Sequence, residues 1–310
     1  MKKFALLLAL ALLGTLSLQA ADKPRKLVMI AGKQSHPPLM HEFRAGTLLL
    51  EKCLQGVPGL VVEVHTNGWV SSPSAFDGAD AVFIYADGGG KHPAVIEDHL
   101  EILRGLVKKG VGFGCAHYGV EVQKDKGGPE FTEWIGGYYE NSFSVNPIWT
   151  PDYQKFPNHP ITRGVKAFSV KDEWYFNMRF REGMQGVTGI LVAKPSDATR
   201  DGPYVYPKGP YPHIQAMKGR DEVMMWAVQR PDGGRGFGFT GGHFHVNWGD
   251  DNFRKVMLNA LLWLAKVEVP KNGVASRVAD DELFVNLDTK PKMEDAIKAA
   301  REELAKKRGK

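Results

Sequence analysis

The chain has 310 residues, of which 43% are hydrophobic and 24% are charged, a balance that is typical of globular proteins and excludes wholesale disorder. The formal net charge of +5 comes from the two ends, because Lys2, Lys3 and a Lys- and Arg-rich segment at 290–310 carry the excess. The rest of the chain is near neutral. This distribution excludes the basic stripe of a nucleic-acid-binding protein, so no nucleic-acid partner is expected.

The first residues have the pattern of an export signal. Lys2 and Lys3 precede an apolar run at 4–13, and small residues follow up to Ala20 and Ala21. The sequence therefore predicts a signal peptide at 1–20 that is removed, and a periplasmic or secreted protein. The apolar run is too short to span a bilayer, so no membrane association is expected after cleavage.

The next segment alternates apolar strands with helices. We expect strands at 25–32, 60–65, 80–86 and 110–117, and helices at 39–54 and 93–109. Strands that are apolar throughout are typical of a sheet covered on both faces. The pattern predicts an α/β fold with a doubly wound, mostly parallel sheet.

The second half of the chain is less regular. The segment 123–212 is rich in Gly, Pro and aromatic residues, and we expect it to form long loop insertions folded over the sheet, with a strand at 189–193. Further strands are expected at 223–229 and 236–240, then a helix capped by Asp250 or Asp251 and a charged helix at 293–307. The expected division is a signal peptide at 1–20, an α/β domain at 25–270 and a C-terminal extension at 271–310.

Five of the ten histidines follow predicted strands: His36, His41, His117, His243 and His245. Ligands bind outside the carboxyl ends of the strands in sheets of this kind. Gathered imidazoles suit a divalent metal such as zinc, or acid–base chemistry near neutral pH. His243 and His245 would share one face of an extended chain, so with His117 they are the candidate metal ligands. No HExxH or CxxC spacing identifies the metal, and the cofactor stays open.

The turn at 115–119 indicates which residue stands at the tip of the fourth strand. In a strand-to-helix elbow, the residues two before and two after the tip must be small. His117 meets this condition with Cys115 and Gly119, whereas Cys115 at the tip would be flanked by Phe113 and His117. Covalent chemistry by a thiol or a serine hydroxyl at this turn is therefore not expected.

Adjacent carboxylates and aromatic residues form a second candidate group. Asp172 and Glu173 precede Trp174 and Tyr175, and such residues bind sugar hydroxyls or act as bases. A structural role is equally open, because either carboxylate could pair with a neighbouring cation and the aromatic rings could belong to a loop core.

Four separated motifs resemble the ThuA-like (trehalose utilisation) family: SHPPLMHEF at 35–43, CAHYGVE at 115–121, HPITRG at 159–164 with DEWY at 172–175, and GGHFHVNW at 241–248. The resemblance implies a flavodoxin-like, class I glutamine amidotransferase-like fold without the amidotransferase nucleophile. It implies the catalytic residues His117, Glu121, His159, Asp172 and Glu173. It also implies substrate contacts from His36, His41, Tyr175, His245, Asn247 and Trp248. The pair Pro37-Pro38 departs from the Gly expected in the first loop.

Together these observations predict an exported carbohydrate-processing enzyme with a small-molecule sugar substrate. The resemblance suggests 3-keto-glycosides or disaccharides, processed by acid–base or metal-assisted hydrolysis, elimination or isomerisation. A non-catalytic sugar-binding protein of the same fold is the alternative, and a homo-oligomer is left open.

Overall fold

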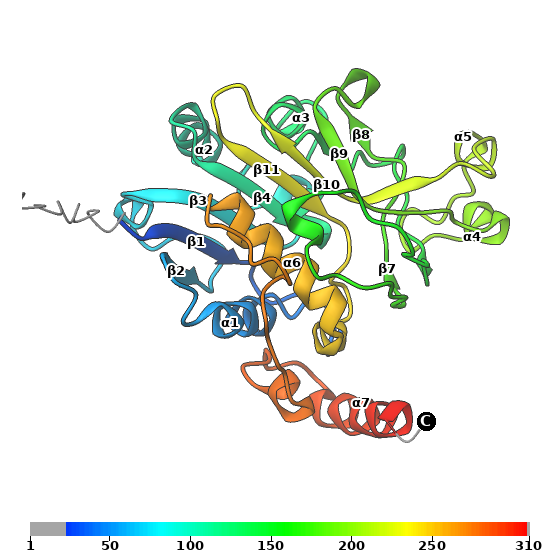
Figure 1. Ribbon diagram of the computed structural model, residues 1–310. Helices are drawn as coiled ribbons and strands as arrows, with labels where there is room; N and C mark the ends of the chain where they lie inside the picture. The colour runs from blue at the N-terminus through cyan, green and yellow to red at the C-terminus, as the bar shows by residue number, and fades with distance from the viewer. Residues whose placement is uncertain (1–22, 309–310) are drawn as a thin grey trace, which may run out of the picture.

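The computed structural model describes residues 23–308, so the predicted signal peptide lies outside the described residues. Seven strands form the central sheet in the order β2-β1-β3-β4-β11-β10-β9 (Figure 1). Their bounds are β1 Arg25–Ala31, β2 Leu60–His65, β3 Ala79–Tyr85, β4 Gly112–Ala116, β9 Val187–Ala193, β10 Glu222–Gln229 and β11 Arg235–Phe239. The first four strands and β11 run parallel, and β10 is antiparallel to both of its neighbours. The prediction of a mostly parallel α/β sheet is confirmed.

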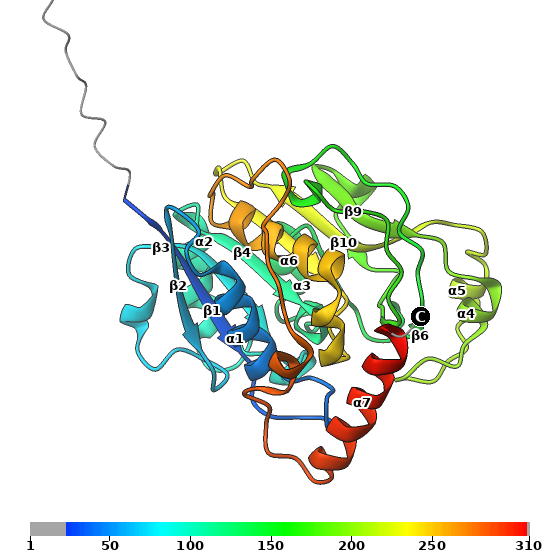
Figure 2. The same cartoon turned by 60° about the horizontal axis from the view of Figure 1, so that its bottom comes forward.

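Helices cover both faces of the sheet, as Figure 2 shows from a second direction. The helices α1 Phe43–Leu54 and α6 Asp251–Leu264 pack on one face, and α2 His99–Lys108 and α3 Gly128–Trp134 pack on the other. Successive residues of β1 face opposite sides of the sheet. Met29 packs in the core under α1 and α6, and Val28 packs in the core under α2 and α3. This double burial explains the uninterrupted apolar strands.

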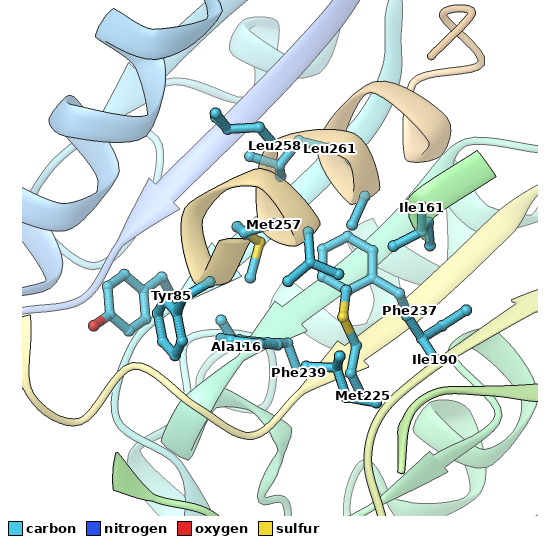
Figure 3. Packing of buried hydrophobic residues seen from close by; sticks show 14 of the residues in the cluster. Tyr85, Ala116, Ile161, Ile190, Met225, Phe237, Phe239, Met257, Leu258 and Leu261 are labelled. Atoms are coloured by element: carbon cyan, nitrogen blue, oxygen red, sulfur yellow. The ribbon is translucent and has the colours of Figure 1, made fainter. Parts of the chain in front are cut away.

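The core on the α6 side is closely packed. Met257 and Leu261 of α6 lie over Phe237 and Phe239 of the sheet (Figure 3), and all four are fully buried. The helix begins as predicted, because the side chain of Asp250 accepts hydrogen bonds from the backbone N–H groups of two first-turn residues. This packing fixes the strand that leads into the loop of His243.

Two helices start later than predicted. The first begins at Phe43 and not at 39, because His36, Leu39 and His41 adopt positive φ angles of 57°, 62° and 49°. These left-handed conformations interrupt a helix and turn the loop back toward the sheet edge. Similarly, α2 begins at His99 and not at 93, after a left-handed residue at Glu97.

The middle segment contains short elements and loops folded against the sheet. Its elements are α3, β5 Gly137–Tyr138, β6 Ile148–Trp149, β7 Asp172–Glu173, β8 Arg179–Phe180, α4 Asp197–Asp201 and α5 Pro212–Gln215. β5 pairs with β8 and β6 with β7. Most of its aromatic residues are buried and form loop core, whereas Tyr206 is exposed.

Beyond α6 the chain forms a 3₁₀ helix at Asp280–Phe284 and then α7 Met293–Arg308, which lies outside the layers of the sheet (Figure 2). Leu283 of the 3₁₀ helix is buried in the core beside α1. Between residues 23 and 308, no helix has both the length and the apolar character that crossing a bilayer requires.

Candidate functional site

A cavity of about 860 Å³ opens at the carboxyl ends of the parallel strands. It is lined by residues from the loops after β1, β3, β4 and β11 and from the middle segment. These include Ser35, His36, His41, Asp87, Tyr118, Glu121, Asn146, Glu173, Tyr175, Tyr206 and His243. The loop contributions explain the position of the site, because parallel strands bring their C-terminal ends to one edge.

Backbone hydrogen bonds join the two loops that carry most of the histidines. The N–H of His41 donates to the carbonyl of His243 (3.1 Å), and the N–H of His245 donates to the carbonyl of Leu39 (2.9 Å). His117 lies at the tip after β4, with a positive φ of 52°. Three chain segments far apart in sequence therefore present imidazoles to one point.

The convergence is close. His117 Nε2 lies 2.9 Å from His41 Nε2 and 3.3 Å from His243 Nδ1, and the same His243 nitrogen lies 2.9 Å from His41 Nε2. The carboxylate oxygen Oε2 of Glu173 completes the group, 2.8 Å from His243 Nδ1 and 3.4 Å from His117 Nε2. His41, His243 and Glu173 line the cavity, whereas His117 is fully buried and meets them from within the protein.

The opposite ring nitrogens fix the protonation of two imidazoles. His41 Nδ1 lies 2.9 Å from the Asp87 carboxylate, and His117 Nδ1 lies 3.0 Å from the Thr240 carbonyl. Both partners are acceptors, so each Nδ1 carries the hydrogen. When the rings are neutral, both Nε2 atoms therefore present lone pairs to the centre, which is how outer-shell groups orient metal-ligating histidines.

The charge balance of the group favours a cation at its centre. Burial raises the pKa of Glu173, but hydrogen bonds to His117 and His243 outweigh this effect and hold the pKa at about 2. Burial lowers the pKa of His117, yet its contacts with Glu173 raise it overall. The pKa of His41 lies well below its usual value because the ring is buried beside other imidazoles. Glu173 is thus an anion, and a proton or a metal ion must offset it.

The donor set fits a divalent metal ion. The ligand atoms of His41, His117, Glu173 and His243 all lie within 4.8 Å of one another. Tetrahedral ligands about 2.0–2.1 Å from zinc are roughly 3.3 Å apart, close to the separations seen here. Three imidazoles and one carboxylate suit zinc and other first-row transition metals.

Other predicted residues line the cavity around this group. The ring of His36 stacks on that of His41 with centroids 3.5 Å apart. The hydroxyl of Tyr175 lies 3.2 Å from His117 Nε2. Glu121 faces the same cavity, and burial together with the negative charge of Glu173 raises its pKa to about 8. A carboxyl group of this kind is largely protonated at neutral pH and can donate a proton.

The structure corrects the predicted role of His245. A 3₁₀ helix starts at this residue, so the chain is not extended there and His243 and His245 do not share a face. The buried ring of His245 lies near Leu283, and burial lowers its pKa to about 4. It is therefore not a ligand of the group; His41 and Glu173 take the place that the sequence assigned to it.

The structure also places four other predicted site residues outside the cavity. Trp248 is fully buried against Phe253, and the side chain of Asn247 donates to the carbonyl of Lys171. His159 caps a 3₁₀ helix beside α6 by accepting the N–H of Ile161. Asp172 is fully buried and accepts backbone N–H groups of the loop that carries His243. These residues support the site or the core and do not line the cavity.

Sequence reasoning missed several cavity residues. Asp87 lies two residues after the end of β3, and the rule that identified the histidines would have identified it too. Asn146 and Tyr206 come from irregular segments that gave no signal. Asn146 donates to Glu173 Oε1 (2.9 Å) and accepts the backbone N–H of Tyr206 (3.1 Å), so it ties the cavity rim to the ligand group.

Cys115 is unsuited to act as a nucleophile. Its side chain is fully buried within β4, and burial raises the pKa of the thiol well above its usual value. A thiolate is the reactive form, so this environment disfavours amidotransferase chemistry, in agreement with the geometry of the turn.

Comparison with known proteins identifies the family. The family model described as "Trehalose utilisation" (ThuA) matches residues 42–264. The solved structure of a ThuA-like protein from Bacteroides uniformis ATCC 8492 is similar at 15% identity and a TM-score of 0.57, covering 79% of this chain and 93% of that chain. One from Parabacteroides merdae ATCC 43184 is similar at 16% identity and a TM-score of 0.52, covering 84% and 94%.

These likenesses support the fold, and no curated protein matches the sequence. The family match covers most of the described domain, including the loops of His117 and His243, and the family carries a carbohydrate-related description. The chain belongs to the ThuA family, whose members have a glutamine amidotransferase-like fold.

Proposed function

We propose that this protein is an exported, metal-dependent enzyme that acts on a carbohydrate at the histidine cavity. The observation that carries the proposal is the convergence of His41, His117, His243 and Glu173 on one point in the wall of a cavity large enough for a sugar. The carbohydrate class comes from the family description, and export comes from the pattern of residues 1–20.

A bound divalent ion would supply Lewis acidity and hold adjacent oxygen atoms of the substrate. A sugar that has a ketone next to a hydroxyl offers two such oxygens. The residues that would hold the ion come from the loops after β1, β4 and β11 and from β7, and three of them, His41, Glu173 and His243, line the cavity in which a substrate would bind. This arrangement favours a keto-sugar over a plain disaccharide.

Two further groups have suitable protonation for elimination from a 3-keto-glycoside. Burial lowers the pKa of His36, which leaves a neutral imidazole able to accept the C2 proton next to the ketone. The electron pair of the broken C2–H bond then forms a double bond between C1 and C2 as the bond between C1 and the glycosidic oxygen breaks. The leaving oxygen takes its proton from Glu121, whose raised pKa keeps the carboxyl group protonated. The products are an unsaturated keto-sugar and a free alcohol.

The test is elemental analysis of the purified mature protein, followed by turnover of 3-keto-glycosides and plain disaccharides with and without chelator. We expect about one equivalent of a transition metal per chain and consumption of the keto-glycosides, which chelation abolishes. His243→Ala should lose metal and activity. His65→Ala is the matched control, because that ring pairs with Glu63 and does not line the cavity.

The alternatives give different results. If the purified protein is active, metal-free and insensitive to chelator, the proposal of metal dependence is wrong, and acid–base chemistry by His36 and Glu121 remains. If the protein binds sugars but converts no member of the panel, the proposal of an enzyme is wrong, and the sugar-binding alternative is favoured. Export is tested separately by mass spectrometry of the periplasmic and secreted chain, which should begin at Ala21 or Asp22.

A further inference from the structure

We propose that the C-terminal extension positions residues of the site. Lys290 and its neighbours bind the loop that carries His36 and His41 and fix its backbone. This inference rests on the proposed metal centre for its consequence. The contacts that carry it belong to residues 34–42 and 288–290, and we call the latter segment the clasp.

The centre of the clasp is a buried ion pair. Lys290 Nζ lies 2.8 Å from Glu42 Oε1, and the two side chains are 2% and 0% exposed. The same ammonium group donates to the carbonyl of Met40 (2.7 Å) and, at a longer distance, to that of Pro37 (3.4 Å). One cation therefore joins two carbonyls of the histidine loop to the carboxylate of the residue that precedes α1.

Glu42 and the backbone of the clasp extend this connection. Glu42 Oε1 accepts the N–H of Leu39 (2.9 Å), and Oε2 accepts the N–H of Asp288 (3.0 Å). Before the loop, the side-chain amide of Gln34 donates to the carbonyl of Thr289 (2.7 Å). The loop is thus attached to residues about 250 positions later in the chain at its beginning, middle and end.

The loop depends on outside support. His36, Leu39 and His41 have positive φ angles, which side chains other than Gly rarely adopt and which persist only where surrounding contacts over-determine them. Pro37 and Pro38 have no N–H to donate, so the loop has fewer hydrogen bonds of its own. The clasp supplies the missing contacts by binding the loop carbonyls.

Position, more than stability, is what such a pair provides. A buried ion pair is costly to desolvate and is weak evidence for net stabilisation, whereas it allows few alternative arrangements of its partners. His41 directly precedes Glu42, so fixing the Glu42 carboxylate fixes the backbone that presents His41 Nε2 to His117 and His243. Lys290 is therefore a positioning residue of the metal centre.

The experiment compares full-length wild type with Lys290→Met, and uses Lys292→Met as the matched control on an exposed neighbour. Three quantities are measured: the affinity for Zn²⁺ in competition with a chromophoric chelator, amide hydrogen exchange, and the unfolding transition. We expect K290M to bind Zn²⁺ about 10-fold more weakly, the lower end of the loss typical of removing an outer-shell partner, because Lys290 acts on the backbone beside His41 and not on its ring. The amides of Leu39 and His41 should exchange faster while those of β3 and β4 do not.

A double variant separates positioning from an unpaired buried charge. Glu42→Gln combined with K290M removes both charges, so it should regain folding stability relative to K290M but keep the weakened Zn²⁺ affinity and the faster loop exchange. Recovery of the wild-type affinity in the double variant would overturn the proposal, as would unchanged affinity and exchange in K290M. If wild type binds no Zn²⁺, the metal centre fails, and loop exchange alone decides whether the clasp holds the loop.

Discussion

The Nε2 atoms of His41 and His117 lie 2.9 Å apart, although the partners of their Nδ1 atoms leave a lone pair on each when the rings are neutral. Two lone pairs at this distance repel each other unless a proton or a metal ion lies between them. Hydrogen bonding to Glu173 raises the pKa of His117 despite burial, which favours a proton on this ring in the metal-free protein. A metal ion must displace this proton.

Metal binding is therefore expected to release about one proton per site near neutral pH, because the ligands must be deprotonated to coordinate. Calorimetric titration of the chelator-treated protein with Zn²⁺ in buffers of different ionisation enthalpy measures this number. Glu173→Gln should bind more weakly and release less, since the pKa of His117 falls when the carboxylate is absent. Binding without proton release would contradict the protonation assigned here.

Asp87 is expected to control the metal affinity through His41. Its carboxylate accepts the hydrogen of His41 Nδ1 at 2.9 Å and thereby turns Nε2 toward the centre. Asp87→Asn should lower the Zn²⁺ affinity by about 10–100-fold, with little change in the unfolding free energy of the metal-free protein. Competitive metal titration measures the effect. Asp152→Asn is the control, because Asp152 is exposed and its carboxylate accepts a hydrogen bond from the side chain of Gln154.

Glu121 gives the metal-free protein a dependence on pH. Its folded pKa of about 8 lies above the usual carboxyl value of 4.5 because of burial and the charge of Glu173. Between these values the folded chain binds more protons than the unfolded chain, so stability falls as pH rises. The slope reaches at most about 1.4 kcal/mol per pH unit.

Urea unfolding at several pH values between 5 and 8, with chelator present, checks this effect. Glu121→Gln should reduce the decline in stability across that range, and it should also lower turnover if Glu121 donates the proton to the leaving group. A decline that is equally steep in the variant would assign the pH dependence to other groups.

The sheet was predictable because its strands are apolar throughout, and apolar runs that alternate with helices have few other solutions. The residue at which α1 starts could not be predicted in the same way. The apolar pattern continues through Leu39 and Met40, and nothing local indicates the left-handed conformations of His36 and His41. Those conformations depend on contacts with Glu42 and Lys290. Because Lys290 lies about 250 residues later in the chain, the local sequence around the loop does not reveal this contact.

The histidine cluster was predictable for a similar physical reason: parallel strands end at one edge, so residues that follow them meet. The rule identified His36, His41, His117 and His243. It failed for His245, because spacing implies a shared face only while the chain stays extended, and a 3₁₀ helix begins there. The sequence also does not tell Glu173 from Asp172. Successive side chains of β7 point in opposite directions, so Glu173 joins the cluster whereas Asp172 accepts backbone N–H groups.

Tyr206 is expected to contribute to substrate binding and not to the chemistry. Tyr206 is 71% exposed and lines the cavity, and its backbone N–H donates to the side-chain oxygen of Asn146. A ring in this position can stack on a sugar, an interaction worth about 1 kcal/mol. Tyr206→Ala should therefore raise KM roughly 5–10-fold with little change in kcat. Tyr206→Phe should behave like wild type, and equal loss in both variants would assign the effect to the hydroxyl.

Asp172 is expected to carry a large share of the stability of the site. Its buried carboxylate accepts the N–H groups of Gly242 (2.7 Å), His243 (3.1 Å) and Phe244 (3.3 Å), so it holds the backbone of the loop that presents His243. In Asp172→Asn the amide removes the charge and turns an NH₂ group toward donors that it cannot satisfy.

Leaving buried donors unpaired costs about 1–3 kcal/mol, and more where the lost acceptor is charged, so we expect a loss of about 3 kcal/mol in unfolding free energy. Urea unfolding with chelator present measures this loss without a contribution from metal binding. Asp221→Asn, which changes an exposed carboxylate, should stay within about 0.5 kcal/mol of wild type. Because the displaced loop also carries a metal ligand, Asp172→Asn should in addition bind Zn²⁺ more weakly at temperatures where it remains folded. Wild-type stability and affinity would show that the loop is held by its other contacts, chiefly the backbone bonds to the loop of His41.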